Sequence, residues 1–133
     1  ENNRFDGTLE AVDGTRCTVL IADGARIAGS VGAPLPVGRR VTVSLRPERV
    51  QIRAAGHTMP ASTDCCLTGL LREVIYLGDH VRARVALPGN DDFAVKRPID
   101  EAHRLPAIGG AIELAWAPEH CRAFAREDET HQP

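Results

Sequence analysis

The sequence is poor in lysine and in aromatic residues. Lys96 is the only lysine among 133 residues, and aromatic residues make up 4% of the chain. A phosphate-binding loop of the type G-x-x-x-x-G-K-[ST] needs a lysine directly after its glycines, whereas Lys96 follows a Phe-Ala-Val segment at residues 93–95. The chain therefore lacks the usual sequence signature for binding ATP.

Other common signatures are missing as well. No stretch approaches the ~20 uninterrupted apolar residues needed to cross a bilayer, and residues 1–4 do not begin a basic segment followed by an apolar run, as in a secretory signal. The opening residues instead predict a cut through a longer chain. No C-x-x-C pair occurs, so neither a zinc site nor a thioredoxin-like motif is predicted, and a reduced, cytosolic state is the simplest interpretation. The cysteines are Cys17, Cys65, Cys66 and Cys121.

Acidic and basic residues nearly balance, with 18 Asp and Glu against 16 Lys and Arg and a net charge of −2. The charges are interspersed, and no basic run accompanies the few aromatic side chains, so we do not expect a nucleic-acid partner. Catalytic and metal-binding residues are not predicted either. No nucleophilic residue lies at a spacing that would indicate a catalytic set with the adjacent Asp79 and His80. His80, His103 and His120 lie far apart and lack the paired spacing of metal ligands.

Short segments of alternating or β-branched apolar residues recur about every ten positions, and each ends at Gly, Pro or Asp, which is typical of an all-β barrel or sandwich. The pairs Asp13-Gly14 and Asp23-Gly24 indicate hairpins, because glycine accepts the positive φ of tight β-turns. No segment keeps a 3.6-residue apolar period, so helix is expected to be nearly absent. The expected strands cover residues 7–12, 16–22, 25–29, 40–45, 50–54, 67–76, 80–87, 92–96 and 111–115.

The two halves of the sequence are similar. Residues 38–48 and 109–119 each contain a glycine, an alternating strand and then a Pro-Glu pair, and residues 7–12 match residues 69–74. Repeats of about 60 residues would each bury too little surface alone, so we expect them to pack together or interweave. The expected division is a first β unit at 1–55, a linker or exposed loop at 56–65, a second β unit at 66–125 and a disordered tail at 126–133.

Four segments together resemble a known family. They are Glu1-Asn2-Asn3, residues 44–48 (Ser-Leu-Arg-Pro-Glu), residues 74–80 (Val-Ile-Tyr-Leu-Gly-Asp-His) and residues 116–120 (Trp-Ala-Pro-Glu-His). In this order and spacing, the chain resembles the C-terminal transport-associated OB (TOBE) region of ABC-importer ATP-binding subunits, most like the spermidine/putrescine class. The resemblance implies an all-β fold of OB-like or molybdate-binding-protein-like barrels, with two related β units packed or interwoven.

The same resemblance implies a regulatory and dimerisation domain of an ABC importer for polyamines or a similar small solute. This region would be no enzyme and would hold no cofactor, whereas the parent subunit would be a transport ATPase that uses ATP and Mg²⁺. Its implied partners are the ATPase domain of the same chain, a second copy of the subunit and, indirectly, the membrane permease subunits. Its implied location is cytoplasmic, on the inner face of the bacterial cell membrane.

Surface residues in these segments are the candidates for interdomain contacts. Arg46 suits such a contact because its planar guanidinium binds carboxylates through two bonds. A plainer interpretation stays open, in which a proline ends a strand beside surface-paired Arg46 and Glu48, and Gly78 marks a bend with Tyr76 packed inside. The candidates are Arg46, Glu48, Tyr76, Asp79, His80 and Glu119.

Two rival functions also stay open. Asn3, Gly7 and the hairpin that follows are faintly similar to oxyanion-binding domains of this barrel type, in which backbone amides hold an anion. A small-ligand or oxyanion-binding sensor is therefore the alternative to a transporter domain. An independent hydrolase has no supporting motif.

Overall fold

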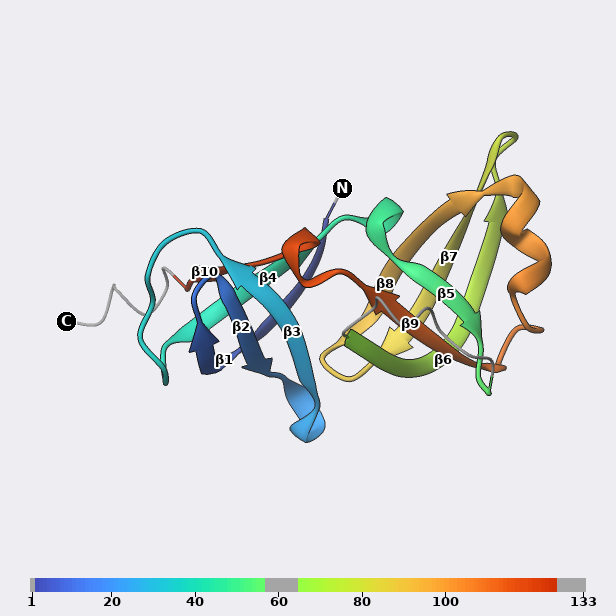
Figure 1. The fold of residues 1–133 in the computed structure, drawn as a ribbon. Coiled ribbons are helices and arrows are strands. Elements are labelled where there is room, and N and C mark those ends of the chain that lie inside the picture. The colour runs from blue at the N-terminus through green and yellow to red at the C-terminus, as the bar shows by residue number, and fades with distance from the viewer. Residues whose placement is uncertain (1, 57–64, 127–133) are drawn as a thin grey trace.

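The computed structural model describes residues 2–56 and 65–126, which form two β lobes lying side by side (Figure 1). The expected all-β fold class is confirmed. The linker expected at 56–65 and the tail expected at 126–133 lie almost entirely outside the described residues. The strands are β1 (Asn3–Asp13), β2 (Arg16–Leu20), β3 (Arg26–Val31), β4 (Arg40–Leu45), β5 (Gln51–Ala54), β6 (Cys65–Tyr76), β7 (His80–Leu87), β8 (Asn90–Pro98), β9 (Ala111–Trp116) and β10 (Cys121–Ala125). Between them lie the short 3₁₀ helices η1 (Ala22–Gly24), η2 (Pro47–Arg49), η3 (Ile99–Arg104) and η4 (Pro118–His120).

The two lobes exchange strands. The first lobe is a closed barrel with the strand order β1-β2-β3-β10-β4, and the second is a five-stranded sheet with the order β5-β9-β6-β7-β8. β5 therefore leaves the first half of the sequence to pair with β9, while β10 leaves the second half to pair with β4 and, in parallel, with β3. The expected interweaving of two related β units is confirmed, and the residue boundaries proposed for those units stay a prediction.

Both exchanges take place at equivalent turns. β4 continues through η2 into β5, and β9 continues through η4 into β10. Each turn holds a buried proline, Pro47 or Pro118, in its first turn, where the fixed φ of proline suits a helical conformation. In Figure 1 the green turn at η2 and the red turn at η4 both lie at the junction of the lobes. The Pro-Glu pairs matched in the sequence are thus the two crossing points.

The repeat extends to one glycine in each lobe. Gly7 of β1 lies directly against the backbone carbonyl of Leu20, and a Cβ atom at Gly69 of β6 would lie 2.5 Å from the carbonyl oxygen of Ala86. Neither position has room for a side chain, so the close approach of the neighbouring strand requires glycine. A bulge follows shortly after each glycine in the β1–β2 and β6–β7 ladders, which increases the local twist.

One hydrophobic core runs through both lobes. Phe5 of β1 and Phe93 of β8 have ring centroids 5.5 Å apart, and the rings of Phe93 and Trp116 of β9 are 6.4 Å apart. The indole N–H of Trp116 donates a hydrogen bond to the carbonyl of Ala28 in the first lobe at 3.2 Å, so its polar end is also satisfied. Because these rings come from both sheets, the core does not divide between the lobes.

Asn3 is a buried polar residue at the junction, with 4% of its surface exposed. Its Nδ2 donates to the carbonyl of Ala94 at 2.7 Å, and the Ala94 N–H donates to its Oδ1 at 2.8 Å. Ala94 lies in β8, an edge strand of the second sheet. The amide of Asn3 therefore supplies to this part of β8 the two hydrogen bonds that a neighbouring strand would otherwise make.

The second sheet is not closed by strand pairing, because β5 and β8 are its two edges. Arg97 of β8 spans the gap, which we call the seam: its Nη1 donates to the carbonyls of Glu48 and Val50, at 3.3 and 3.4 Å, just before β5. Its Nε and Nη2 bond to both carboxylate oxygens of Glu101 in η3, at 3.1 and 2.9 Å. At the seam, hydrogen bonds from the Arg97 side chain thus take the place of a backbone hydrogen-bond ladder between β5 and β8.

Replacing Asn3 should destabilise the fold strongly. Asn3→Ala removes both hydrogen bonds and leaves the N–H and C=O of Ala94 buried without their partner, so the free energy of unfolding should fall by about 2–4 kcal/mol. Urea unfolding followed by circular dichroism measures this change. The neighbouring exposed Asn2 provides the control, since Asn2→Ala should stay within about 0.5 kcal/mol of the parent chain. Equal stability of the two variants would show that the hydrogen bonds between Asn3 and Ala94 do not stabilise the fold.

The seam should also give stability a pH dependence. The hydrogen bond from Arg97, partly opposed by burial, lowers the pKa of Glu101. A carboxyl with a lowered pKa stabilises the folded state above its unfolded value of about 4.3, and this stabilisation is lost as the pH falls through the folded pKa. The stability difference between the parent chain and Glu101→Gln should therefore be constant from pH 8 to 6 and shrink on acidification below about pH 5.

Urea unfolding at each pH tests this expectation. In an Arg97→Ala background the hydrogen bond is absent, so the effect of Glu101→Gln and its pH dependence should both be smaller, as in a double-mutant cycle. A difference that stays the same at every pH, or that survives removal of Arg97, would show that the pair does not act in this way.

Candidate functional site

The first candidate site lies between the two crossing turns. A surface pocket of about 460 Å³ there brings together Arg46, Glu48 and Glu119. Glu119 lies about seventy positions after the other two residues in the sequence. All three side chains are exposed, and the turns that carry them are anchored by buried prolines. We call this the Pro-Glu pocket; its charged and imidazole-bearing lining residues are Arg46, Glu48, Arg49, Glu119, His120 and Arg122.

A second pocket, the hairpin pocket, adjoins the first through Glu48 and has a volume of about 380 Å³. It brings Glu48 together with Asp79 and His80 of the β6–β7 hairpin. His80 Nδ1 lies 2.7 Å from Asp79 Oδ1, and this bond lowers the pKa of Asp79. None of the residues that line the pocket is a Ser, Thr or Cys, so the Asp-His pair has no hydroxyl or thiol there to activate. The Asp79–His80 hydrogen bond lies at the surface, where such a contact contributes little to stability.

Tyr76 lines neither of these pockets. It ends β6 opposite Val81, and 65% of its surface is exposed. The interpretation that packs Tyr76 inside the bend is therefore wrong, because the hairpin extends beyond the core at this point. The structure brings five of the six candidate residues into two adjoining pockets and leaves Tyr76 apart from them. Their role in contacts with other domains stays a prediction.

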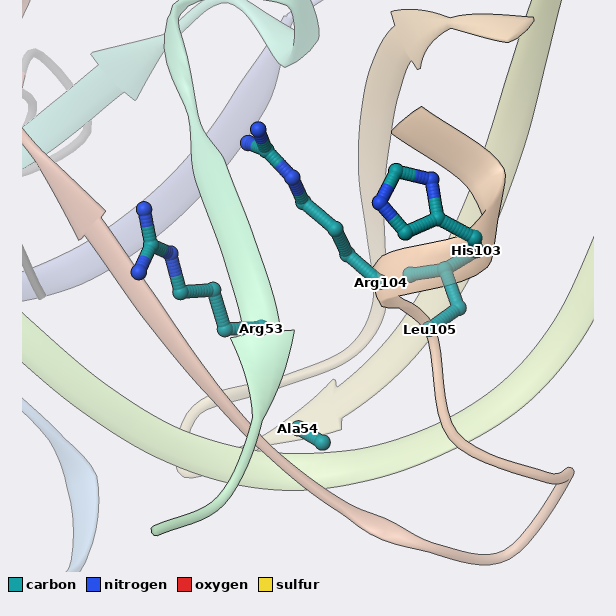
Figure 2. A pocket seen from close by; sticks show the side chains of 5 residues that line it. All are labelled: Arg53, Ala54, His103, Arg104 and Leu105. Carbon is teal, nitrogen blue, oxygen red and sulfur yellow. The ribbon is translucent and has the colours of Figure 1, made fainter. Parts of the chain in front are cut away.

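A third pocket lies beside the seam, between β5 and the end of η3 (Figure 2). This seam pocket has a volume of about 410 Å³ and is lined by Arg53, Ala54, His103, Arg104 and Leu105. Figure 2 shows Arg53 and Arg104 extending from β5 and η3 toward the same end of β5, with the His103 ring beside Arg104. This site could not be predicted from the sequence, because its residues come from segments that carry no shared motif.

In the described part of the chain, few side chains are placed for redox or metal chemistry. Cys17 and Cys121 are both buried, and burial raises the pKa of the Cys17 thiol, which keeps it in its unreactive protonated form. No group of three or more His, Cys, Asp and Glu side chains among the described residues is placed to hold a metal ion. Within the same residues, no helix has the length and apolar character needed to span a membrane.

Known proteins are similar to this chain in sequence or in fold. The spermidine/putrescine import ATP-binding protein PotA of Acidothermus cellulolyticus is 30% identical over 133 aligned residues, which cover 99% of this chain and 34% of that protein. PotA of Rubrobacter xylanophilus is 28% identical over 123 residues, covering 91% of this chain and 31% of that protein. The chain thus spans about a third of the length of these relatives.

Among solved structures, the cytoplasmic molybdate-binding protein ModG superposes with a TM-score of 0.82, covering 93% of this chain and 96% of that chain at 17% identity. This likeness confirms the expected molybdate-binding-protein-like fold. Residues 43–124 match the TOBE domain family, and the matched segment includes both crossing turns and the whole second sheet. The resemblance inferred from the four sequence segments is confirmed, and the chain belongs to the TOBE domain family.

Proposed function

We propose that this chain is the regulatory and dimerisation domain of the ATP-binding subunit of an ABC importer, with polyamines such as spermidine and putrescine as the best candidate solutes. The main support is the match to import ATP-binding proteins over 99% of this chain but only 34% of the relative. The remaining part of the parent subunit would bind ATP and Mg²⁺ and hydrolyse ATP. This domain would contribute no catalytic residue.

In this proposal the domain works through its surface. Its partners would be the ATPase domain of the same chain, a second copy of the subunit and, indirectly, the membrane permease subunits, on the cytoplasmic face of the membrane. The Pro-Glu pocket suits such a contact, because charges of both signs lie close together there: Arg46, Glu48 and Glu119 are all exposed. The buried prolines hold both turns in one conformation, which reduces the entropy lost on association.

A sensor of small ligands or oxyanions is the second candidate function. Its support is the fold shared with ModG, which is described as a molybdate-binding protein. The two residues that suggested this function have structural roles here, since the Asn3 amide bonds to Ala94 and Gly7 packs against Leu20. A sensor function would therefore depend on other residues.

The length of the native polypeptide separates the two functions. An antibody raised against this chain should detect, in source cells, a product about three times as long as the chain, because the chain spans 31% and 34% of its relatives. Peptide sequencing of that product should then reveal the G-x-x-x-x-G-K-[ST] loop. A native product of this chain's own length would instead favour the free-standing sensor and would require the transporter proposal to be withdrawn.

The interface proposal makes a separate prediction for Arg46. In the full-length subunit, Arg46→Ala should weaken self-association by about 1–2 kcal/mol, or roughly five- to thirtyfold in Kd, because an interfacial arginine loses its carboxylate partners. Sedimentation equilibrium measures the association, and circular dichroism checks that the fold is intact. Arg26→Ala, which changes an exposed arginine of β3 bonded to Glu10, is the matched control and should leave Kd unchanged. Unaltered association of the Arg46 variant would rule out this contact.

A further inference from the structure

The outer face of the first barrel has features of a binding site that neither proposed function uses. We propose that this face binds a single free nucleotide, with its base stacked on Phe124 and its phosphate groups near Arg4. The proposal depends on the charge of the face, on its exposed aromatic ring and on the strand register. It requires neither a parent transporter nor a G-x-x-x-x-G-K-[ST] loop, because surface side chains would supply the contacts.

Three neighbouring strands, β1, β4 and β10, form this face, which we call the barrel face. Successive residues of a strand point inward and outward in turn, and the burial of these three strands alternates in the same way. The outward positions of residues 2–8, 40–46 and 122–126 hold one carboxylate, Asp6, and five arginines, which are Arg4, Arg40, Arg46, Arg122 and Arg126. The sequence shows no basic run around Phe124, because these arginines come from three separate segments. The nearly balanced charge of the whole chain therefore does not extend to this face.

The carboxylate of the barrel face already has partners. Thr42 Oγ1 donates a hydrogen bond to Asp6 Oδ1 at 2.9 Å, and Arg126 Nη1 lies 3.7 Å from Asp6 Oδ2. Arg4 and Arg122 form no ion pair within the part of the chain that the structure describes. An approaching anion thus meets positive charge that no described carboxylate neutralises at close range.

Phe124 lies in the middle of this positive face. It belongs to β10, 52% of its surface is exposed, and its same-face neighbours along the chain are Arg122 and Arg126. Its ring stacks on no other aromatic ring among the described residues, whereas the three buried aromatic side chains pack in the core. An exposed ring among cations suits a ligand that combines a flat π system with negative charge. A nucleotide has both, in its base and its phosphate groups.

The strand register places the ring and the charge within reach of one ligand. Arg4 lies opposite Ser44, which in turn lies opposite Arg122. Phe124 is two residues further along β10, so two strand spacings of ~4.8 Å and two residues of ~3.3 Å separate its Cα atom from that of Arg4 by roughly 12 Å. Arg4, Ser44 and Phe124 line one pocket of about 610 Å³, which is within the range of small-molecule sites. The Ser44 hydroxyl between the other two side chains can donate a hydrogen bond to a phosphate oxygen.

The barrel face favours a single nucleotide over a strand of nucleic acid. Proteins that bind single strands stack successive bases on several aromatic side chains along a basic groove. Phe124 is the only aromatic residue at the outward positions of β1, β4 and β10. Beyond it, the adjoining Pro-Glu pocket carries Glu48 and Glu119, which would repel a continuing phosphate backbone. We therefore expect one base and one group of phosphates.

Titration calorimetry and ¹H–¹⁵N NMR on the 133-residue chain test the proposal at constant ionic strength. The probes are ADP, adenosine, pyrophosphate and a single-stranded oligoadenylate. ADP should bind and shift the amide signals of Arg4, Ser44 and Phe124. Adenosine and pyrophosphate should each bind at least about tenfold more weakly than ADP, because each lacks one of the two groups that the face recognises. The oligoadenylate should bind no more tightly than ADP.

Paired variants separate the two halves of the ligand. Phe124→Leu should weaken ADP binding about fivefold or more and leave pyrophosphate binding unchanged, because only the base stacks on the ring. Arg4→Gln should weaken ADP and pyrophosphate binding about tenfold and leave adenosine binding unchanged, since it removes a charge-assisted hydrogen bond. Tyr76→Leu, at an exposed aromatic residue of the second lobe, and Arg26→Gln, at an exposed arginine of β3, are the matched controls and should leave ADP binding unaltered.

Circular dichroism checks the fold of each variant, and the NMR shifts of the unaltered chain decide the question if a variant unfolds. Four outcomes would overturn the proposal. They are no binding of ADP, equal affinity for ADP and pyrophosphate, tighter binding of the oligoadenylate than of ADP, and a loss of ADP binding in the control variants as large as in the Phe124 and Arg4 variants. None of them bears on the length of the native polypeptide or on self-association through Arg46, so the proposed transporter function would be unaffected.

Discussion

The two hydrogen bonds between the Asn3 side chain and the backbone of Ala94 are the constraint on which the arrangement of the lobes depends. They fix the start of β1 against an edge strand of the other lobe, in a place where water is excluded. The neighbouring rings of Phe5, Phe93 and Trp116 then contribute to an apolar core shared by both lobes. An apolar contact alone would tolerate sliding, whereas the paired donor and acceptor of one amide permit one register.

The fixed position of the two lobes determines which side chains meet at the surface. With the lobes held together, the two chain crossings meet at the junction, and each places an exposed glutamate beside a buried proline. Residues from opposite halves of the sequence thereby share the Pro-Glu pocket. The same exchange of strands has unequal results in the two lobes: β10 completes a closed barrel, while β5 leaves a seam that Arg97 bridges and beside which a basic pocket remains. A nearly symmetric fold thus carries two chemically different sites.

Local patterns in the sequence predicted the strands well, because alternation and Asp-Gly turns are short-range signals. The matched Pro-Glu pairs also predicted two equivalent elements. The strand exchange itself could not be derived from these patterns, because the pairing of β10 depends on which strand fills the space between β3 and β4 in the first barrel. The helix η3 was missed because its six residues, with no regular apolar period, follow a proline and pack through a few side chains. Tyr76 was expected inside by one interpretation, yet the hairpin carries it past the core. The seam pocket lies between the exchanged strand β5 and η3, so it could not be predicted without both the strand exchange and this helix.

The exchange of β10 has a kinetic consequence. Ser30 of β3 and Cys121 of β10 are 91 positions apart, yet the Ser30 hydroxyl bonds to the Cys121 carbonyl within one barrel. During synthesis on a ribosome, the first four strands emerge long before the strand that closes them, and until then the edges of β3 and β4 stay unpaired. Such distant pairing slows folding and leaves partly folded chains open to aggregation. The first lobe thus has to wait for the second, and the chain completes its fold as a single unit.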